Sequence, residues 1–174
     1  MLTSILLLFT GLLNPSETPS DTTGWKNLES NKYGAKYPST WQAETYENAT
    51  LEFSINSPLV DEDDIYSEFV SLAALPLPGL NKTLDTYIEE FVKDIPFTYK
   101  KAIITKNEKS MRAGKPCYVL EYVGVINEFP VAYLQYIWLE YDVCYTLSYT
   151  AQQGSYEKFK EKGVQIMDSF TFKQ

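Results

Sequence analysis

The residues best suited to chemistry in this chain are four consecutive acids, Asp61, Glu62, Asp63 and Asp64, with Glu68 close behind them. Calcium binds several carboxylate and carbonyl oxygens at about 2.3–2.6 Å, and adjacent acids on a loop can supply such oxygens. The alternating spacing and the glycine of an EF-hand loop are missing here. The sequence therefore favours a solvated acidic loop, with a calcium site as the alternative, and no other cofactor is expected.

Histidine is absent from the whole chain. Its absence removes the usual general base near neutral pH and the commonest ligand of transition metals. It also excludes Ser-His-Asp and Cys-His catalytic sites. No phosphate-binding loop or metal motif replaces them, so the sequence predicts a protein that is not an enzyme. A carboxylate pair for glycoside hydrolysis stays open, because the geometry of such a pair is tertiary.

Charge is unevenly distributed along the chain. Residues 44–68 contain eight acids and no base, whereas residues 93–115 contain seven bases and two acids. Two opposed lobes of charge could orient the protein against a charged partner or anionic lipid, although a solvated surface without a binding role is favoured. The candidate contact residues for a partner or lipid are Lys100, Lys101, Lys106, Lys109 and Arg112.

Two glycosylation acceptor patterns occur, at Asn48 and Asn81. They matter only in a host that glycosylates exported proteins, and such short patterns arise easily by chance.

Residues 1–13 form an apolar segment without a charge, and residues 14–24 form a tether rich in Ser, Thr and Pro. A helix needs roughly 20 apolar residues to span a bilayer, so the first segment is too short and fits the core of an export signal, removed or retained as an anchor. Residues 25–174 are the length of a single domain. The net charge of −8 argues against binding to nucleic acid.

Two helices are expected in this domain. Leu84, Ile88, Phe91 and Ile95 lie on one face at helical spacing, and Thr83 and Pro96 are the expected N-cap and end. A second helix is expected to start at Ser155.

Alternating or continuous apolar runs predict the strands. The segment 31–41 is expected to form a short strand, a proline turn and an aromatic anchor. The further expected strands are 51–56, 68–77, a Lys-rich strand over 99–112 near a sheet edge, and a meander over 116–126, 131–140 and 142–151. Strands and helices in this order predict an α+β fold, an antiparallel β-sheet flanked by helices.

The meander is expected to form one packed aromatic and aliphatic face rather than a stacking platform for sugars or bases. Tight turns are expected at Asn127-Glu128 and Tyr141-Asp142. The residues predicted to share this face are Tyr118, Leu120, Tyr122, Leu134, Tyr136, Trp138, Tyr145, Leu147 and Tyr149. In that register Cys117 and Cys144 lie together on the other face, in strands separated by a third. Two strand spacings, about 10 Å, exceed the limit for a disulfide, so two buried free thiols are expected unless the strand order differs.

Three segments resemble the PsbP family of extrinsic photosystem proteins. They are YGAKYPSTW (33–41), GKPCYVLEY (114–122) with the later CYTLSYTAQQGSYEKF (144–159), and VQIMDSFTF (164–172). The resemblance covers roughly residues 25–172. The resemblance implies an αβα sandwich. Because these motifs concern packing, they support an inference about the fold more strongly than one about the function.

The branches of the family suggest different roles. Some members lie on the lumenal side of photosystem II, others resemble exported lipoproteins, and a distant branch binds the small GTPase Ran. The apolar leader favours the exported branches. No metal ligand is carried over because histidine is absent, and Leu12 stands where a lipoprotein signal requires Cys after LLLFTG.

The sequence thus predicts an exported, non-catalytic accessory or binding protein with a monomeric domain. It would associate with the membrane surface through its N-terminal segment and contact a membrane protein complex or an envelope partner. The alternative is a cytosolic protein that binds a Ran-type small GTPase.

Overall fold

The structure is a computed structural model that describes residues 24–47, 50–59, 66–79 and 81–173. The predicted leader and nearly all of the tether lie outside these residues. Within the described part, no helix is long and apolar enough to cross a membrane.

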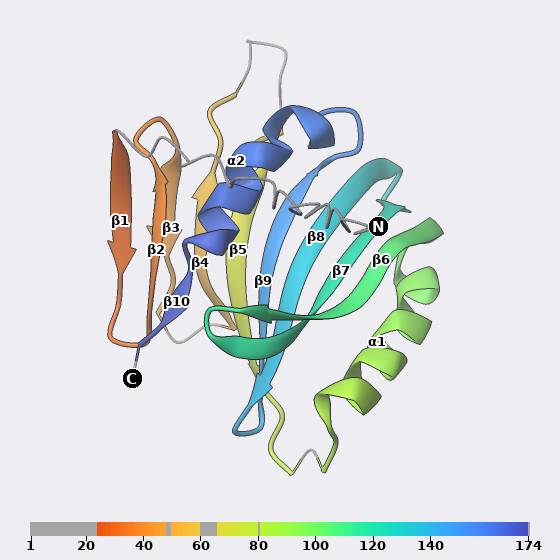
Figure 1. The fold of residues 1–174 in the computed structure, drawn as a ribbon. Coiled ribbons are helices and arrows are strands. Elements are labelled where there is room, and N and C mark those ends of the chain that lie inside the picture. The colour runs from red at the N-terminus through yellow and green to blue at the C-terminus, as the bar shows by residue number, and fades with distance from the viewer. Residues whose placement is uncertain (1–23, 48–49, 60–65, 80, 174) are drawn as a thin grey trace, which may run out of the picture.

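A seven-stranded antiparallel sheet forms the centre of the molecule, in the order β3-β4-β5-β9-β8-β7-β6 (Figure 1). Its strands are β3 (Gln42–Thr45), β4 (Leu51–Asn56), β5 (Phe69–Pro76), β6 (Lys100–Arg112), β7 (Lys115–Ile126), β8 (Phe129–Glu140) and β9 (Val143–Gln152). The predicted meander is β7, β8 and β9. The Lys-rich strand is β6, and it lies at the edge of the sheet as expected.

A second, smaller sheet stands beside the first. It consists of β1 (Trp25–Glu29), β2 (Tyr33–Pro38) and β10 (Thr171–Phe172), in the order β1-β2-β10. The end of the described chain therefore pairs with its beginning. This sheet could not be predicted from the sequence, because β10 has only two residues and so shows no alternation of apolar and polar residues.

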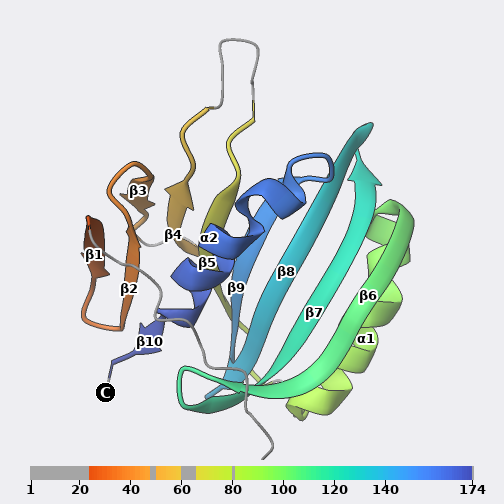
Figure 2. The same ribbon diagram turned by 45° about the horizontal axis from the view of Figure 1, so that its top comes forward.

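Two helices cover opposite faces of the large sheet, α1 (Leu84–Thr98) on one and α2 (Tyr156–Asp168) on the other (Figures 1 and 2). Thr83 caps α1 as predicted, since its Oγ1 accepts a hydrogen bond of 3.2 Å from the amide of Thr86. The helix continues to Thr98 rather than ending at Pro96. The predicted α+β sandwich is confirmed.

The larger core lies between α2 and the sheet. A Cβ atom built on Gly163 of α2 would lie 2.6 Å from Cδ2 of Tyr149, so only glycine lets the helix approach this strand so closely. Trp138 and Phe170 complete the centre of this core and are almost fully buried. A smaller core lies under α1, where Ile88 packs with Leu120.

The structure corrects the predicted face of the meander. Asn127 and Glu128 form a two-residue turn with positive φ, so Ile126 pairs with Phe129 and Leu120 pairs with Gln135. Leu120 and its even-numbered neighbours on β7 therefore face α1. The remainder of the predicted set, Leu134, Tyr136, Trp138, Tyr145, Leu147 and Tyr149, faces α2. The turns at 127–128 and 141–142 are those expected, but the first pairs even-numbered residues of β7 with odd-numbered residues of β8, so the prediction assigned the side chains of β7 to the wrong face.

The same register separates the two cysteines. Cys117 packs in the core under α2, and Cys144 packs in the core under α1. They lie on opposite faces and not on one face as predicted, because Cys117 belongs to β7, whose faces the prediction reversed. Both are buried free thiols in this structure.

Candidate functional site

The acidic loop that the sequence offered as a calcium site, Asp61 to Asp64, lies outside the described residues. Its described neighbour, Glu68, is a buried carboxylate, 2 % exposed. The carboxylate accepts hydrogen bonds from Ser57 Oγ, at 3.1 Å, and from Ser155 Oγ at the start of α2. These bonds join the β4–β5 end of the sheet to α2, which is a structural role. Among the described residues no three Asp, Glu or Cys side chains are grouped to hold a metal ion.

The predicted basic residues do not form one patch. Lys109 lies 2.7 Å from Asp85 of α1, and this hydrogen bond, with one from Tyr118, holds the pKa of the Asp85 carboxyl below its usual value. Arg112 lies on the other face of β6, over the ring of Tyr136 and 3.6 Å from Asp168. The strand alternation thus sends these two cations to opposite faces of the sheet.

The other three predicted contact residues, Lys100, Lys101 and Lys106, lie between the start and the middle of β6. Lys106 Nζ lies 3.2 Å from Oε1 of Glu108 on the same strand. Lys100 and Lys101, at the start of β6, are exposed and have no ion-pair partner among the described residues. Of the five candidate contacts, these two are the ones whose charge is left for an external partner.

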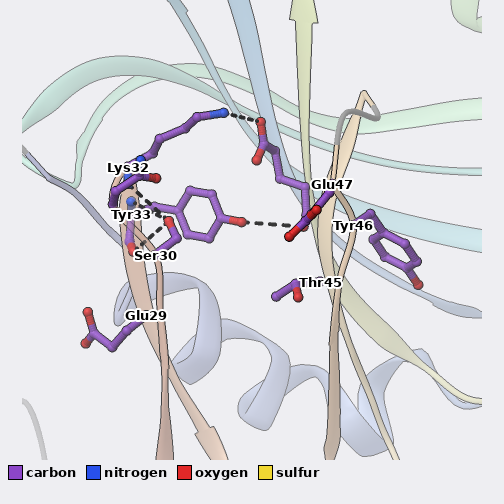
Figure 3. A pocket seen from close by; sticks show the side chains of 9 residues that line it. Glu29, Ser30, Lys32, Tyr33, Thr45, Tyr46 and Glu47 are labelled. Atoms are coloured by element: carbon purple, nitrogen blue, oxygen red, sulfur yellow. Dashed lines mark hydrogen bonds and ion pairs between the residues drawn. The ribbon is translucent and has the colours of Figure 1, made fainter.

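A polar cleft of about 520 Å³ lies between the β1–β2 hairpin and the strands β3 and β4. Figure 3 shows Tyr33 reaching into this cleft, while the ring of Tyr46 points away from it. Lys32 Nζ lies 3.1 Å from Glu52 Oε1, and the Tyr33 hydroxyl donates to the Glu52 carbonyl at 3.4 Å. Burial raises the pKa of Tyr33, so its hydroxyl stays protonated and remains a donor.

The cleft continues past Lys32 and Glu52 into a second one of about 350 Å³, which Val143 and Tyr145 line. Ser30, Lys32 and Tyr33 on the walls of the first cleft bind other lining residues through their side chains. Such a lining can bind a polar ligand, and it presents no nucleophile beside a base. Sequence analysis missed the cleft, because it forms where two sheets meet and its residues come from separate strands.

Only one of the two glycosylation candidates lies within the described residues. Asn81 is exposed in the connection before α1, and Asn48 lies outside the described residues. Thr83, which belongs to the acceptor pattern of Asn81, also caps α1. Modification of either asparagine remains a prediction.

Comparison with known proteins gives one family and a consistent fold. The sequence model of the PsbP family matches residues 24–172. No curated protein sequence matches the chain.

Solved structures share the fold at low sequence identity. Cyanobacterial PsbP (CyanoP) from Synechocystis sp. PCC 6803 is 15% identical with a TM-score of 0.59, over 90% of this chain and 96% of that one. Protein PA94 from Pseudomonas aeruginosa, described as a putative regulator of unknown function, is 9% identical with a TM-score of 0.62, over 83% and 94%. LpqN of Mycobacterium tuberculosis, described as involved in cell envelope biogenesis, is 10% identical with a TM-score of 0.59, over 86% and 91%.

Proposed function

The chain belongs to the PsbP family, and from this premise we propose that it is an exported accessory protein without catalytic activity, held at a membrane and acting through surface contacts with a membrane or envelope complex. The family match carries the proposal, because it spans 24–172 and so takes in all the described elements. The fold likeness to CyanoP and to LpqN supports it, since one is a PsbP protein and the other is described as involved in cell envelope biogenesis.

The surface chemistry supports contact rather than catalysis. In the polar cleft Lys32 is already paired with the carboxylate of Glu52, and the Tyr33 hydroxyl is bonded to the main chain. The two exposed lysines at the start of β6 offer charge to a partner. The apolar segment 1–13 supports export and a position close to the membrane.

Capture of partners from native membranes tests this function. We would express the full chain with a C-terminal tag in its own host, crosslink intact cells, and identify by mass spectrometry the proteins that purify with it. Membrane or envelope proteins are expected among them. Recovery with cytosolic proteins alone, such as a small GTPase, would contradict the proposal.

A set of charge reversals tests which surface makes the contact. Replacing Lys100, Lys101 and Lys106 by Glu should weaken capture, because the attraction of exposed charges to a partner is lost. Reversal of Lys26, Lys36 and Lys162, which are also exposed and lie away from β6, is the matched control and should leave capture unchanged. If both sets of variants capture membrane proteins equally well, the lysines of β6 do not make the contact.

A further inference from the structure

We infer that one corner of the domain, defined by Phe97, Lys100, Lys101 and Phe129, docks on the surface of an anionic lipid bilayer. The inference rests on the proposed membrane association and adds to it the face that meets the lipid. It also gives the domain a membrane contact that is separate from the N-terminal segment.

Three elements bring these residues together. A Cβ atom on Gly124 would lie 2.6 Å from Cβ of Tyr99, so the residue that follows α1 sits directly on β7. Lys100 pairs with Val125 of β7, and Val125 pairs in turn with Pro130 of β8. Two strand spacings, about 10 Å, therefore separate Lys100 from the start of β8. Figures 1 and 2 show the end of α1, the start of β6 and the β7–β8 turn at the same end of the sheet.

The apolar side chains of this corner are strongly exposed. Phe97 is 89% exposed and Phe129 is 54% exposed. Phe97 follows Pro96 in the last turn of α1, and Phe129 follows the turn at Asn127 and Glu128, so both project from the ends of elements. Single exposed apolar residues are ordinary, but two phenylalanines at one end of the sheet, beside two exposed lysines, indicate a contact surface.

The charges around them fit an anionic bilayer. Lys100 and Lys101 are exposed and have no ion-pair partner among the described residues, so their charges are available to lipid phosphate. Lysine binds lipid phosphate while its alkyl stem lies along apolar surface, and each base near an anionic surface contributes about 1 kcal/mol. Exposed phenylalanines beside lysines are typical of proteins that lie in the bilayer interface.

The orientation of the bound protein gives the sharpest test. Phe129→Cys and Tyr141→Cys, each in the full chain, would carry an environment-sensitive fluorophore, since the native cysteines are buried. Tyr141 is the matched control because it is 96% exposed and lies in the turn between β8 and β9, at the opposite end of the sheet. With vesicles of phosphatidylcholine and phosphatidylglycerol, the label at 129 should shift to the blue and lose accessibility to aqueous iodide. The label at 141 should keep the accessibility it has in solution.

The outcomes separate this inference from the proposed function. If the protein binds the vesicles but both labels stay equally accessible, the N-terminal segment alone holds it, and the corner is refuted while membrane association stands. If the full chain binds no vesicles, both are contradicted.

Variants of the corner provide the energetic test. The double variant Lys100→Glu, Lys101→Glu should partition onto anionic vesicles roughly tenfold more weakly than the unmodified protein, or weaker still. Any change in its partition onto vesicles of pure phosphatidylcholine is subtracted from this effect. Phe97→Ser with Phe129→Ser should weaken binding to anionic vesicles as well. The pair Lys26→Glu and Lys36→Glu, on the small sheet, should change it little. If both lysine pairs lower the partition onto anionic vesicles equally, the attraction depends on net charge alone, and the proposal that this corner docks on the bilayer is contradicted.

Discussion

Tyr99 lies so close to Gly124 that a Cβ atom on the glycine would be 2.6 Å from Cβ of the tyrosine. This contact sets the distance between the end of α1 and strand β7, and with it the position of the exposed corner. Because a Cβ atom is attached directly to the backbone, no side-chain rotation of Tyr99 can relieve the overlap.

Gly124→Ala should therefore destabilise the protein by about 1–3 kcal/mol, the usual cost of added volume in a packed site. Urea denaturation measures this loss. Gly154→Ala is the matched control, because a Cβ atom added there would meet no atom within 4 Å and its φ is not positive. It should change stability by less than about 0.5 kcal/mol. A neutral Gly124→Ala would show that α1 can shift away from the sheet.

Glu68 should contribute to stability through its two serine partners. Glu68→Ala removes the acceptor of the buried Ser57 hydroxyl, whereas the Ser155 hydroxyl keeps its bond to the Gln152 carbonyl, and a loss of about 1–3 kcal/mol is expected. Chemical denaturation provides the measurement. Glu44 is the matched control, since it accepts a hydrogen bond of 2.9 Å from Tyr46 at an exposed site. Equal losses in the two variants would contradict a specific role for the buried carboxylate.

Glu121 should make stability depend on pH. Burial acts to raise the pKa of this carboxyl, but the hydrogen bonds from Lys160 at 2.6 Å and Tyr156 at 2.7 Å outweigh burial and hold the pKa below its usual 4.5. A carboxyl with a lowered pKa in the folded state stabilises the protein above the unfolded value and ceases to do so as the pH falls through the folded value.

Glu121→Gln should consequently cost about 1 kcal/mol at pH 7, and the difference from the unmodified protein should shrink as the pH falls below 4.5. Denaturation curves across this range measure it. Glu157→Gln is the control, because Glu157 also faces Lys160, at 3.6 Å, but is 82% exposed. A difference that stays constant down to pH 2 would rule out the linkage.

The two thiols should be present and slow to react. Burial raises the pKa of Cys117 to about 11, against a smaller opposing effect of Arg112, and burial raises the pKa of Cys144 as well. At pH 8 both are therefore protonated and shielded, and a thiol reagent should modify the native protein only slowly.

In the same titration, denatured and unreduced protein should show two reactive thiols per chain, the same number as a reduced sample used as the reference. No free thiol under these conditions would mean that Cys117 and Cys144 are bridged, which their positions on opposite faces of the sheet do not allow.

Local patterns predicted the elements well. The N-cap at Thr83 and the start of α2 after Ser155 follow from short-range signals that the structure retains. The lysines of β6 correctly indicated an edge strand, because unpaired edges are protected by charge.

Features that depend on pairing could not be predicted in this way. Strand β7 is apolar on both faces, since helices cover both, and its hydrophobic pattern therefore does not fix its register against β8. The polar cleft depends on the meeting of two sheets. The exposed corner depends on Phe97 and Phe129, which are far apart in the chain and reach the same end of the sheet only after β6, β7 and β8 have paired.

The central claim, export to a membrane, is tested most directly by the intact mass of the native protein, measured separately in membrane and soluble fractions. A chain that starts between about Leu12 and Trp25, or an unprocessed chain found only in membranes, is the predicted result. An unprocessed chain that starts at Met1 in the soluble fraction would contradict the claim and direct attention to cytosolic partners.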